Sequence, residues 1–265
     1  MNFIIIIPAR FFSTRFPGKL LADIQGKPMI IRVIEQALTS QASKIIVAVD
    51  NIRIQQVIES EYSLLKDKVE VCLTKSTHKS GTERLLEVVT LHKFKDKQII
   101  VHLQGDEPLI SSFMIHQVVR SIYAVSKKNN IRVATLASPI KYYYEVKDCN
   151  IVKVVINMYN NALYFSRSMI PWVKENNYSG EIINSLWLRH IGVYAYRADF
   201  LQHYSQWDKS PLEEFENLEQ LRVLWIGETI HVSIIHNNTS NIISVDTVES
   251  LKYVNKLFLK KQANK

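Results

Sequence analysis

Cysteine is scarce in this chain of 265 residues, which contains only Cys72 and Cys149. Neither belongs to a CxxC pair or to a cluster with histidine, so the sequence excludes a disulfide framework and offers no paired-cysteine zinc site. Both are expected to be buried free thiols, which fits a reducing compartment. The eight histidines form no HExxH motif, and no GxSxG elbow occurs. Zinc-enzyme and serine-hydrolase chemistry are therefore disfavoured.

Long apolar runs are also missing. The apolar stretch at residues 3–7 meets Pro8, far short of the roughly 18–20 apolar residues that a membrane span requires. No basic residues precede this stretch, as they would in a secretory signal. We therefore expect a cytoplasmic protein that has no membrane partner.

Acidic residues are outnumbered, which leaves a formal charge of +8. A basic excess of this kind can indicate binding to nucleic acid, to another anionic surface or to small anionic substrates. Many of the lysines crowd the C-terminal segment, where solvated charge is the simpler interpretation: Lys252, Lys256, Lys260, Lys261 and Lys265. The other cations of interest are interleaved with carboxylates, so a nucleic-acid partner is not expected.

The remaining composition, 47% hydrophobic and 22% charged, is ordinary for a globular protein. Apolar runs recur with α/β spacing and predict strands at 2–7, 44–49, 69–73, 98–103 and 133–138, with helices at 28–40, 51–60, 80–93 and 111–127. This rhythm predicts a mostly parallel central sheet flanked by helices. The second half is less regular, with strands predicted at 152–156, 192–197 and 230–235 and helices at 199–206, 212–225 and 247–260.

A cluster of cations follows the first predicted strand, where open α/β sheets bind their ligands. Arg10, Arg15 and Lys19 lie within ten residues, together with hydroxyls and a glycine. The loop is neither a Walker A motif, because Leu20 follows Lys19, nor a dinucleotide GxGxxG motif. Converging cations and backbone N–H groups are what a triphosphate needs, so we predict a triphosphate site. The alternative is a surface loop with scattered charge.

Seven blocks of the sequence resemble the CMP-Kdo synthetases, also called 3-deoxy-manno-octulosonate cytidylyltransferases. Kdo is the eight-carbon sugar acid 3-deoxy-manno-octulosonate. They are PARxxSTRxPGKxL at 8–21, HxSGTER at 78–84, VHLQGDEP at 101–108, ALYFSR at 162–167, LRHIGVYAYR at 188–197, PLEEFENLEQLRVL at 211–224 and VDT at 245–247. The resemblance implies a Rossmann-like nucleotidyltransferase fold with a smaller α+β lobe for sugar binding and dimerisation. It divides a single domain, 1–265, into a nucleotide-binding half (about 1–140), the lobe (about 141–240) and a C-terminal metal-ligand segment with a helix (241–265).

The same resemblance implies roles for individual residues. CTP is assigned to Ala9, Arg10, Ser13, Arg15, Lys19, Ser80, Gly81 and Arg84. Kdo is assigned to Gln104, Arg167, His190, Tyr194, Glu219 and Gln220. Mg²⁺ is assigned to Asp106 and Asp246, and catalysis to Lys19, Arg10, Arg15, Asp106 and Asp246. Because Glu219 and Gln220 are adjacent on a predicted helix, they are not expected to point the same way.

Structural explanations compete with several of these assignments. Asp106 and Glu107 could belong to an ordinary turn before Pro108. Asp246 could be the N-cap of the last helix, with Glu249 completing a capping box. Residues 80–84 could simply begin a helix that Ser80 or Thr82 caps.

The resemblance implies a homodimeric enzyme that couples CTP to Kdo for lipopolysaccharide synthesis and releases pyrophosphate. The expected mechanism is an in-line displacement at the α-phosphorus, in which the protein mainly positions and neutralises charge. The nearest alternative is a relative that charges another acid sugar, such as a sialic acid, or one that uses UTP.

Overall fold

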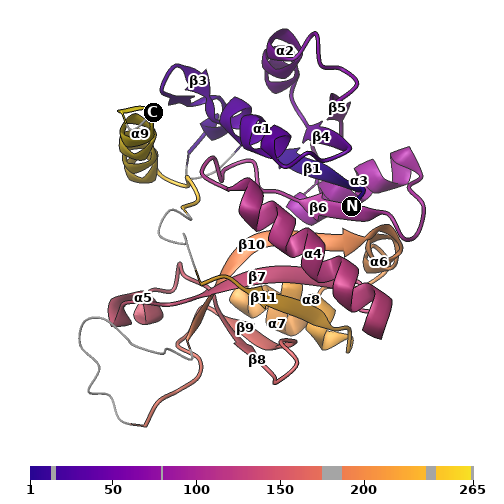
Figure 1. Ribbon diagram of the computed structural model, residues 1–265, viewed down its shortest axis with the longest axis vertical. Helices are drawn as coiled ribbons and strands as arrows, with labels where there is room; N and C mark the ends of the chain where they lie inside the picture. Colours follow the sequence, from indigo (N-terminus) through magenta and orange to yellow (C-terminus); the bar gives the residue numbers. More distant parts are fainter. Residues whose placement is uncertain (13–15, 79, 175–186, 237–242, 264–265) are drawn as a thin grey trace.

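The computed structural model describes residues 1–12, 16–78, 80–174, 187–236 and 243–263. A nine-stranded sheet forms its centre (Figure 1). Seven strands run in the order β11 (Ile230–Ile234), β7 (Val133–Pro139), β10 (Leu188–Arg197), β6 (Ile99–His102), β1 (Phe3–Ala9), β4 (Lys44–Val49) and β5 (Val69–Leu73). Within this sheet β6, β1, β4 and β5 are parallel, whereas β10 lies antiparallel between β6 and β7.

The sheet is covered by helices on both faces. One face carries α1 (Met29–Thr39), α2 (Ile52–Glu61) and α4 (Ser112–Asn129), and the other carries α3 (Gly81–His92), α6 (Ala198–Tyr204) and α8 (Gln220–Trp225). The apolar run of strand β1 is continuous because both faces of the strand are buried. Ile5 and Ile7 pack under the first set of helices, and Ile4 and Ile6 pack under the second. The predicted α/β class with a mostly parallel, helix-flanked sheet is confirmed.

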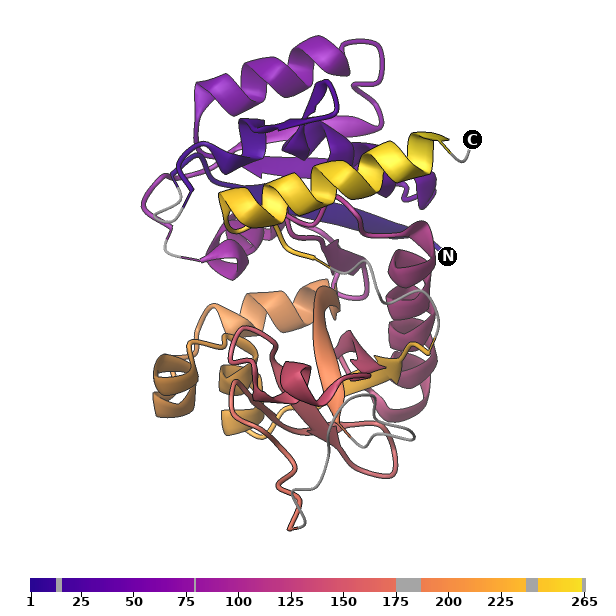
Figure 2. The same ribbon diagram turned by 90° about the vertical axis from the view of Figure 1, so that its left-hand side faces the viewer.

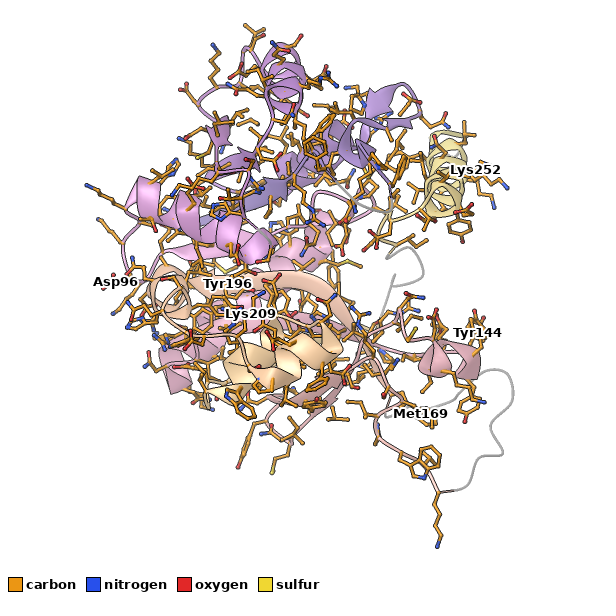
Figure 3. All side chains as sticks on the ribbon, turned by 180° about the vertical axis from the view of Figure 1, so that it is seen from behind. Asp96, Tyr144, Met169, Tyr196, Lys209 and Lys252 are labelled. Carbon is orange, nitrogen blue, oxygen red and sulfur yellow. The ribbon has the colours of Figure 1, made fainter. Side chains whose placement is uncertain are left out.

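Smaller elements complete the molecule. Strands β8 (Lys153–Ile156) and β9 (Ala162–Ser166) extend from the end of β10, near α5 (Tyr143–Lys147) and α7 (Pro211–Glu216). A hairpin of β2 (Asp23–Ile24) and β3 (Lys27–Pro28) packs against α9 (Val248–Ala263), which lies across the first half of the molecule (Figure 2). Lys252 projects from the outer side of α9 (Figure 3).

Two expectations need correction, and three elements were not predicted. Residues 212–225 form two helices, because Asn217 adopts the left-handed conformation (φ 52°) at the end of α7. Strand β9, helix α5 and the β2–β3 hairpin were not predicted. Cys149 is exposed, and only Cys72 is buried. Among the described residues, no helix is both long enough and apolar enough to span a membrane.

Candidate active site

Three distant segments meet at Lys19. Its Nζ donates a hydrogen bond to Asp106 Oδ2 at 2.6 Å and another to Asp246 Oδ1 at 2.9 Å. The two carboxylate segments also contact each other directly, because Val245 N donates to Asp106 O at 2.9 Å. Burial opposes the charge on Lys19, but the two carboxylates raise the pKa of its ammonium above the ordinary value. The predicted convergence of Lys19, Asp106 and Asp246 therefore occurs in the structure.

Neither carboxylate has the purely local role that was considered as the alternative. The cap of α9 is formed by Thr247 and Ser250, whose side chains exchange hydrogen bonds with each other's backbone N–H at 3.0 and 3.2 Å. Asp246 is not the capping residue, and its carboxylate turns toward Lys19 instead. Asp106 likewise extends beyond its own turn to an ammonium that lies 87 positions away in the sequence.

The loop that carries Lys19 leaves the carboxyl end of β1 and folds back on itself. Gly18 adopts a left-handed conformation (φ 67°) that a side chain would strain. Gly18 N bonds Phe11 O at 3.3 Å, and a short 3₁₀ turn then begins at Lys19. Ser13 and Arg15, two predicted CTP residues in this loop, lie outside the described residues.

A polar cavity of about 430 Å³ surrounds the Lys19 cluster. It brings together residues predicted for CTP, for the metal and for the sugar acid: Arg10, Lys19, Ser80, Gly81, Arg84, Gln104, Asp106, Arg167, Glu219 and Asp246. Ala9, another predicted CTP residue, ends strand β1 and packs in the hydrophobic core. Its two neighbours in the chain, Pro8 and Arg10, line the polar cavity instead.

The start of α3 forms one wall of this cavity. Ser80 caps the helix by accepting a hydrogen bond from Glu83 N at 3.2 Å, so the simple capping interpretation is correct. Ser80 and Gly81 nevertheless line the cavity at the same time. The positive end of a helix macrodipole therefore faces the cavity, where it favours an anionic ligand.

Arg84 is held inside this wall by a residue that the sequence analysis missed. Its Nη2 lies 2.9 Å from Asp50 Oδ2, and its Nη1 contacts the Thr74 hydroxyl and the Lys75 carbonyl. Burial lowers the pKa of the Arg84 guanidinium, and Asp50 opposes that shift. The position of Asp50 at the carboxyl end of β4 was the only sequence signal that could have identified it.

A second cavity of about 230 Å³ adjoins the first, because Gly81, Gln104 and Glu219 line both. Its wall contains five of the six residues predicted for the sugar acid: Gln104, His190, Tyr194, Glu219 and Gln220. The sixth, Arg167, lines the first cavity. Glu219 and Gln220 do not lie within one continuous helix, because the chain breaks at Asn217, Glu219 precedes α8 and Gln220 begins it. Both line the second cavity, and of the two Glu219 also lines the first.

Burial sets the charge states in the second cavity. It lowers the pKa of His190 to about 3, so this imidazole is neutral at physiological pH, with Nε2 3.1 Å from the hydroxyl oxygen of Thr135. It also raises the pKa of Glu219, although the hydroxyls of Thr82 and Ser80 oppose that shift. A neutral imidazole and hydroxyl and amide side chains suit a polyhydroxylated ligand better than a second strong anion.

Arg167 is anchored by the end of α7. Its backbone N–H and its Nε donate to the Glu216 carboxylate and carbonyl at 2.9 and 2.8 Å. Its Nη1 donates to Cys149 O at 3.1 Å. Glu216 and Thr135, which position Arg167 and His190, had no distinguishing sequence signal.

The carboxylate oxygens of Asp106 and Asp246 are suitable ligands for a magnesium ion. Asp106 and Asp246 direct one carboxylate oxygen each to the same point, the ammonium of Lys19. Within the described residues, no group of three or more His, Cys, Asp or Glu side chains could hold a metal. Two carboxylates are sufficient for Mg²⁺, because this ion commonly shares its remaining positions with water and substrate phosphates.

Comparison with known proteins places this geometry in context. Residues 4–230 match the cytidylyltransferase family. The 3-deoxy-manno-octulosonate cytidylyltransferase of Blochmanniella floridana is 64% identical over 259 residues, covering 98% of this chain and 99% of that protein. The protein of the same name from Erwinia tasmaniensis is 48% identical, covering 96% and 98%.

Solved structures agree with this match. CMP:2-keto-3-deoxy-manno-octonic acid synthetase in complex with CTP superposes with a TM-score of 0.85 at 36% identity, covering 98% of this chain and 100% of that one. The 4-diphosphocytidyl-2C-methyl-D-erythritol synthase of Anaerococcus prevotii has a TM-score of 0.61 at 12% identity, covering 97% and 99%. The second likeness concerns the fold alone.

Proposed function

The chain belongs to the cytidylyltransferase family, and we propose that it transfers CMP from CTP to the anomeric hydroxyl of Kdo and releases pyrophosphate. The observation that carries this proposal is the meeting of Lys19, Asp106 and Asp246 in one polar cavity, with Arg10 and Arg84 in its wall. Three cationic side chains beside two carboxylates match a triphosphate with its divalent ion.

The two adjoining cavities correspond to the two substrates. The larger one, with the α3 N-terminus and the cations, takes the nucleotide and its phosphates. The smaller one, with His190, Tyr194 and Gln220, takes the hydroxyls of the sugar acid. Arg167 lies in the wall of the larger cavity and supplies a cation for the sugar carboxylate. Gln104 and Glu219 line both cavities, so the reacting groups meet beside them.

The reaction follows from this arrangement as an in-line displacement. A bond forms between the anomeric oxygen and the α-phosphorus, the bond to the bridging oxygen of the β-phosphate breaks, and the hydroxyl proton passes to solvent. Arg10 and Lys19 neutralise charge on the departing pyrophosphate, an electrostatic contribution of the kind that dominates such transfers. Arg15 has the same proposed role on the basis of sequence alone.

Magnesium is the proposed cofactor, held by Asp106 and Asp246. When bound, the ion supplies charge neutralisation at phosphate oxygens and makes a coordinated hydroxyl more acidic. The chain's own contribution is to hold two carboxylates from distant segments at one point, supported by the Val245–Asp106 backbone bond of 2.9 Å. Activity should therefore be lost on chelation and return with Mg²⁺.

Pyrophosphate release provides the test of the function. The protein is assayed with CTP, UTP, GTP and ATP against Kdo and a sialic acid. CTP with Kdo should give the highest kcat/KM by at least about tenfold, a margin that corresponds to about 1.4 kcal/mol. Equal or faster turnover with the sialic acid or with UTP would favour the related transferases instead.

We also propose that the protein is a cytoplasmic homodimer whose product activates Kdo for lipopolysaccharide synthesis. The end of the molecule that carries β8 and β9 exposes large apolar side chains, with Met158 at 86%, Leu163 at 59% and Trp172 at 70% exposure. We propose that these exposed apolar side chains form the contact between the two protomers. Light scattering should give a mass twice that of the 30.7 kDa chain. The Leu163→Glu variant should have the mass of a single chain.

A further inference from the structure

The ammonium of Lys19 lies where the two carboxylates converge, 2.6 Å from Asp106 Oδ2 and 2.9 Å from Asp246 Oδ1. These two side chains are the magnesium ligands of the proposed function, on which this inference rests. A magnesium ion binds oxygen at about 2.0–2.1 Å, so the ion and the ammonium compete for the same carboxylate oxygens. We propose that Lys19 closes the metal site and that the triphosphate opens it by drawing this ammonium onto phosphate oxygens.

Lys19 has the chemistry for such an exchange. Its ammonium is a compact charge on a flexible four-carbon stem, unlike the rigid fork of arginine. The backbone below it is fixed by the turn at Gly18, so the side chain can move without the loop. The side chain is 12% exposed and lines the polar cavity together with Arg10 and Arg84.

The exchange keeps both the Lys19 ammonium and the two carboxylates paired with opposite charge. An ammonium that left the carboxylates for water would remove a countercharge from two neighbouring carboxylates in a half-buried site. A nucleotide brings both replacements, because its phosphates accept the ammonium and its divalent ion takes the carboxylates. Metal binding and nucleotide binding should therefore be coupled, and the coupling is reciprocal.

A simple structural ion pair makes a different prediction. If Lys19 is only a structural ion pair and the ion binds away from Asp106 and Asp246, its removal should weaken the protein, and any gain in metal affinity should persist when either carboxylate is replaced. If Lys19 closes the site, its removal should raise the affinity of the protein for a divalent ion when no nucleotide is present, and this gain should require both carboxylates. The dependence of the gain on Asp106 and Asp246 therefore separates the two explanations.

The experiment measures Mn²⁺ binding without nucleotide, from the electron paramagnetic resonance signal of free Mn²⁺. Lys19→Met should bind Mn²⁺ at least about tenfold more tightly than the wild type, within the usual range of coupling between sites. Lys19→Arg is the matched control, since it keeps a cation near both carboxylates, and its affinity should stay within about threefold of the wild type. Thermal melting confirms that each variant is folded.

The double variants Lys19→Met/Asp106→Asn and Lys19→Met/Asp246→Asn locate the ion. Each should lose the affinity gained by Lys19→Met. The proposal is overturned if Lys19→Met binds Mn²⁺ no more tightly than the wild type, or if neither double variant removes the gain. Failure of the proposed function is a separate result, namely no pyrophosphate release by the wild type from CTP and Kdo with Mg²⁺.

Discussion

Arg84 and Asp50 form an ion pair inside the wall of the nucleotide cavity, with an Nη2–Oδ2 distance of 2.9 Å and side chains that are 2% and 8% exposed. The second oxygen of Asp50 accepts a hydrogen bond from Phe11 N at 2.8 Å. One carboxylate at the end of β4 thus braces both the loop that follows Arg10 and the helix that begins at Gly81. Asp50 positions the cations of the cavity without lining it.

Replacing Asp50 with Asn should therefore affect both stability and nucleotide binding. Loss of one partner from a buried pair leaves an uncompensated guanidinium and typically costs about 3–5 kcal/mol. We expect the free energy of unfolding of Asp50→Asn to fall by about 3 kcal/mol and the KM for CTP to rise at least about tenfold. The KM for Kdo should not change.

Asp199→Asn is the matched control for this variant. Asp199 pairs with Arg197 at the junction of β10 and α6 and lines neither substrate cavity. It should lower stability without a change in the KM for CTP. An unchanged KM for CTP in folded Asp50→Asn would limit Asp50 to a purely structural role.

The cluster around Lys19 leads to a second prediction. Asp106→Ala or Lys19→Ala should reduce kcat/KM by about 10²–10³, or about 3–4 kcal/mol, the usual effect of removing one electrostatic contact to a transition state. Both variants should fold, because the three side chains are partly exposed and not in the core. Asp67→Asn, in the exposed turn before β5, is the control and should keep wild-type turnover. Near-wild-type rates in either alanine variant would contradict the assigned roles.

Buried histidines lead to a third prediction, which concerns acid stability. Burial lowers the pKa of His102 to about 4 and that of His190 to about 3, whereas an unfolded chain has a histidine pKa near 6.5. Below pH 6.5 the unfolded chain therefore binds protons that the native protein excludes, and stability falls as the pH decreases. The contribution is complete above pH 6.5 and is lost progressively towards pH 4.

His102→Gln isolates one of these groups. The wild type should lose about 3 kcal/mol through His102 between pH 6.5 and pH 4, since one pKa unit corresponds to about 1.4 kcal/mol. The variant should show a correspondingly shallower decrease in the free energy of unfolding, measured by urea titration at several pH values. An identical slope in both proteins would mean that His102 becomes protonated in the native state as readily as in the unfolded chain.

Several elements were predictable because a single local signal specifies them. Strands 44–49 and 69–73 were predicted with the bounds that the structure gives, since each is a short apolar run between polar segments. The break between α7 and α8 was missed because it depends on the backbone of Asn217 (φ 52°), which a periodic apolar pattern does not reveal. Strand β9 is half-exposed and, among the described residues, pairs with β8 alone, so the spacing of its apolar residues gave a weak sequence signal.

The candidate site shows a similar division. The cluster of cations directly after the first strand led to Lys19, and the resemblance added Asp106 and Asp246. The contacts among them were not predictable, because Lys19 and Asp246 are 227 positions apart. Asp50 was missed since a lone carboxylate after a strand has no distinguishing sequence context. Its importance arises from Arg84 and Phe11, which only the folded chain brings to it.

Lys153 supports the backbone of Arg167, and no sequence pattern indicated this role. Its side chain is fully buried in β8, and its Nζ donates to the carbonyls of Asp148 at 2.9 Å, Ile151 at 2.6 Å and Arg167 at 2.6 Å. Lys153→Met would leave three carbonyls without this donor, so we expect a loss of at least about 3 kcal/mol in denaturant unfolding. Because Arg167 lines the cavity, the KM for Kdo should also rise. Lys147→Met, at an exposed position of α5, is the control and should change stability by less than about 0.5 kcal/mol. A stable Lys153→Met variant with an unchanged KM for Kdo would show that the three carbonyls find other partners and that Arg167 does not depend on this lysine.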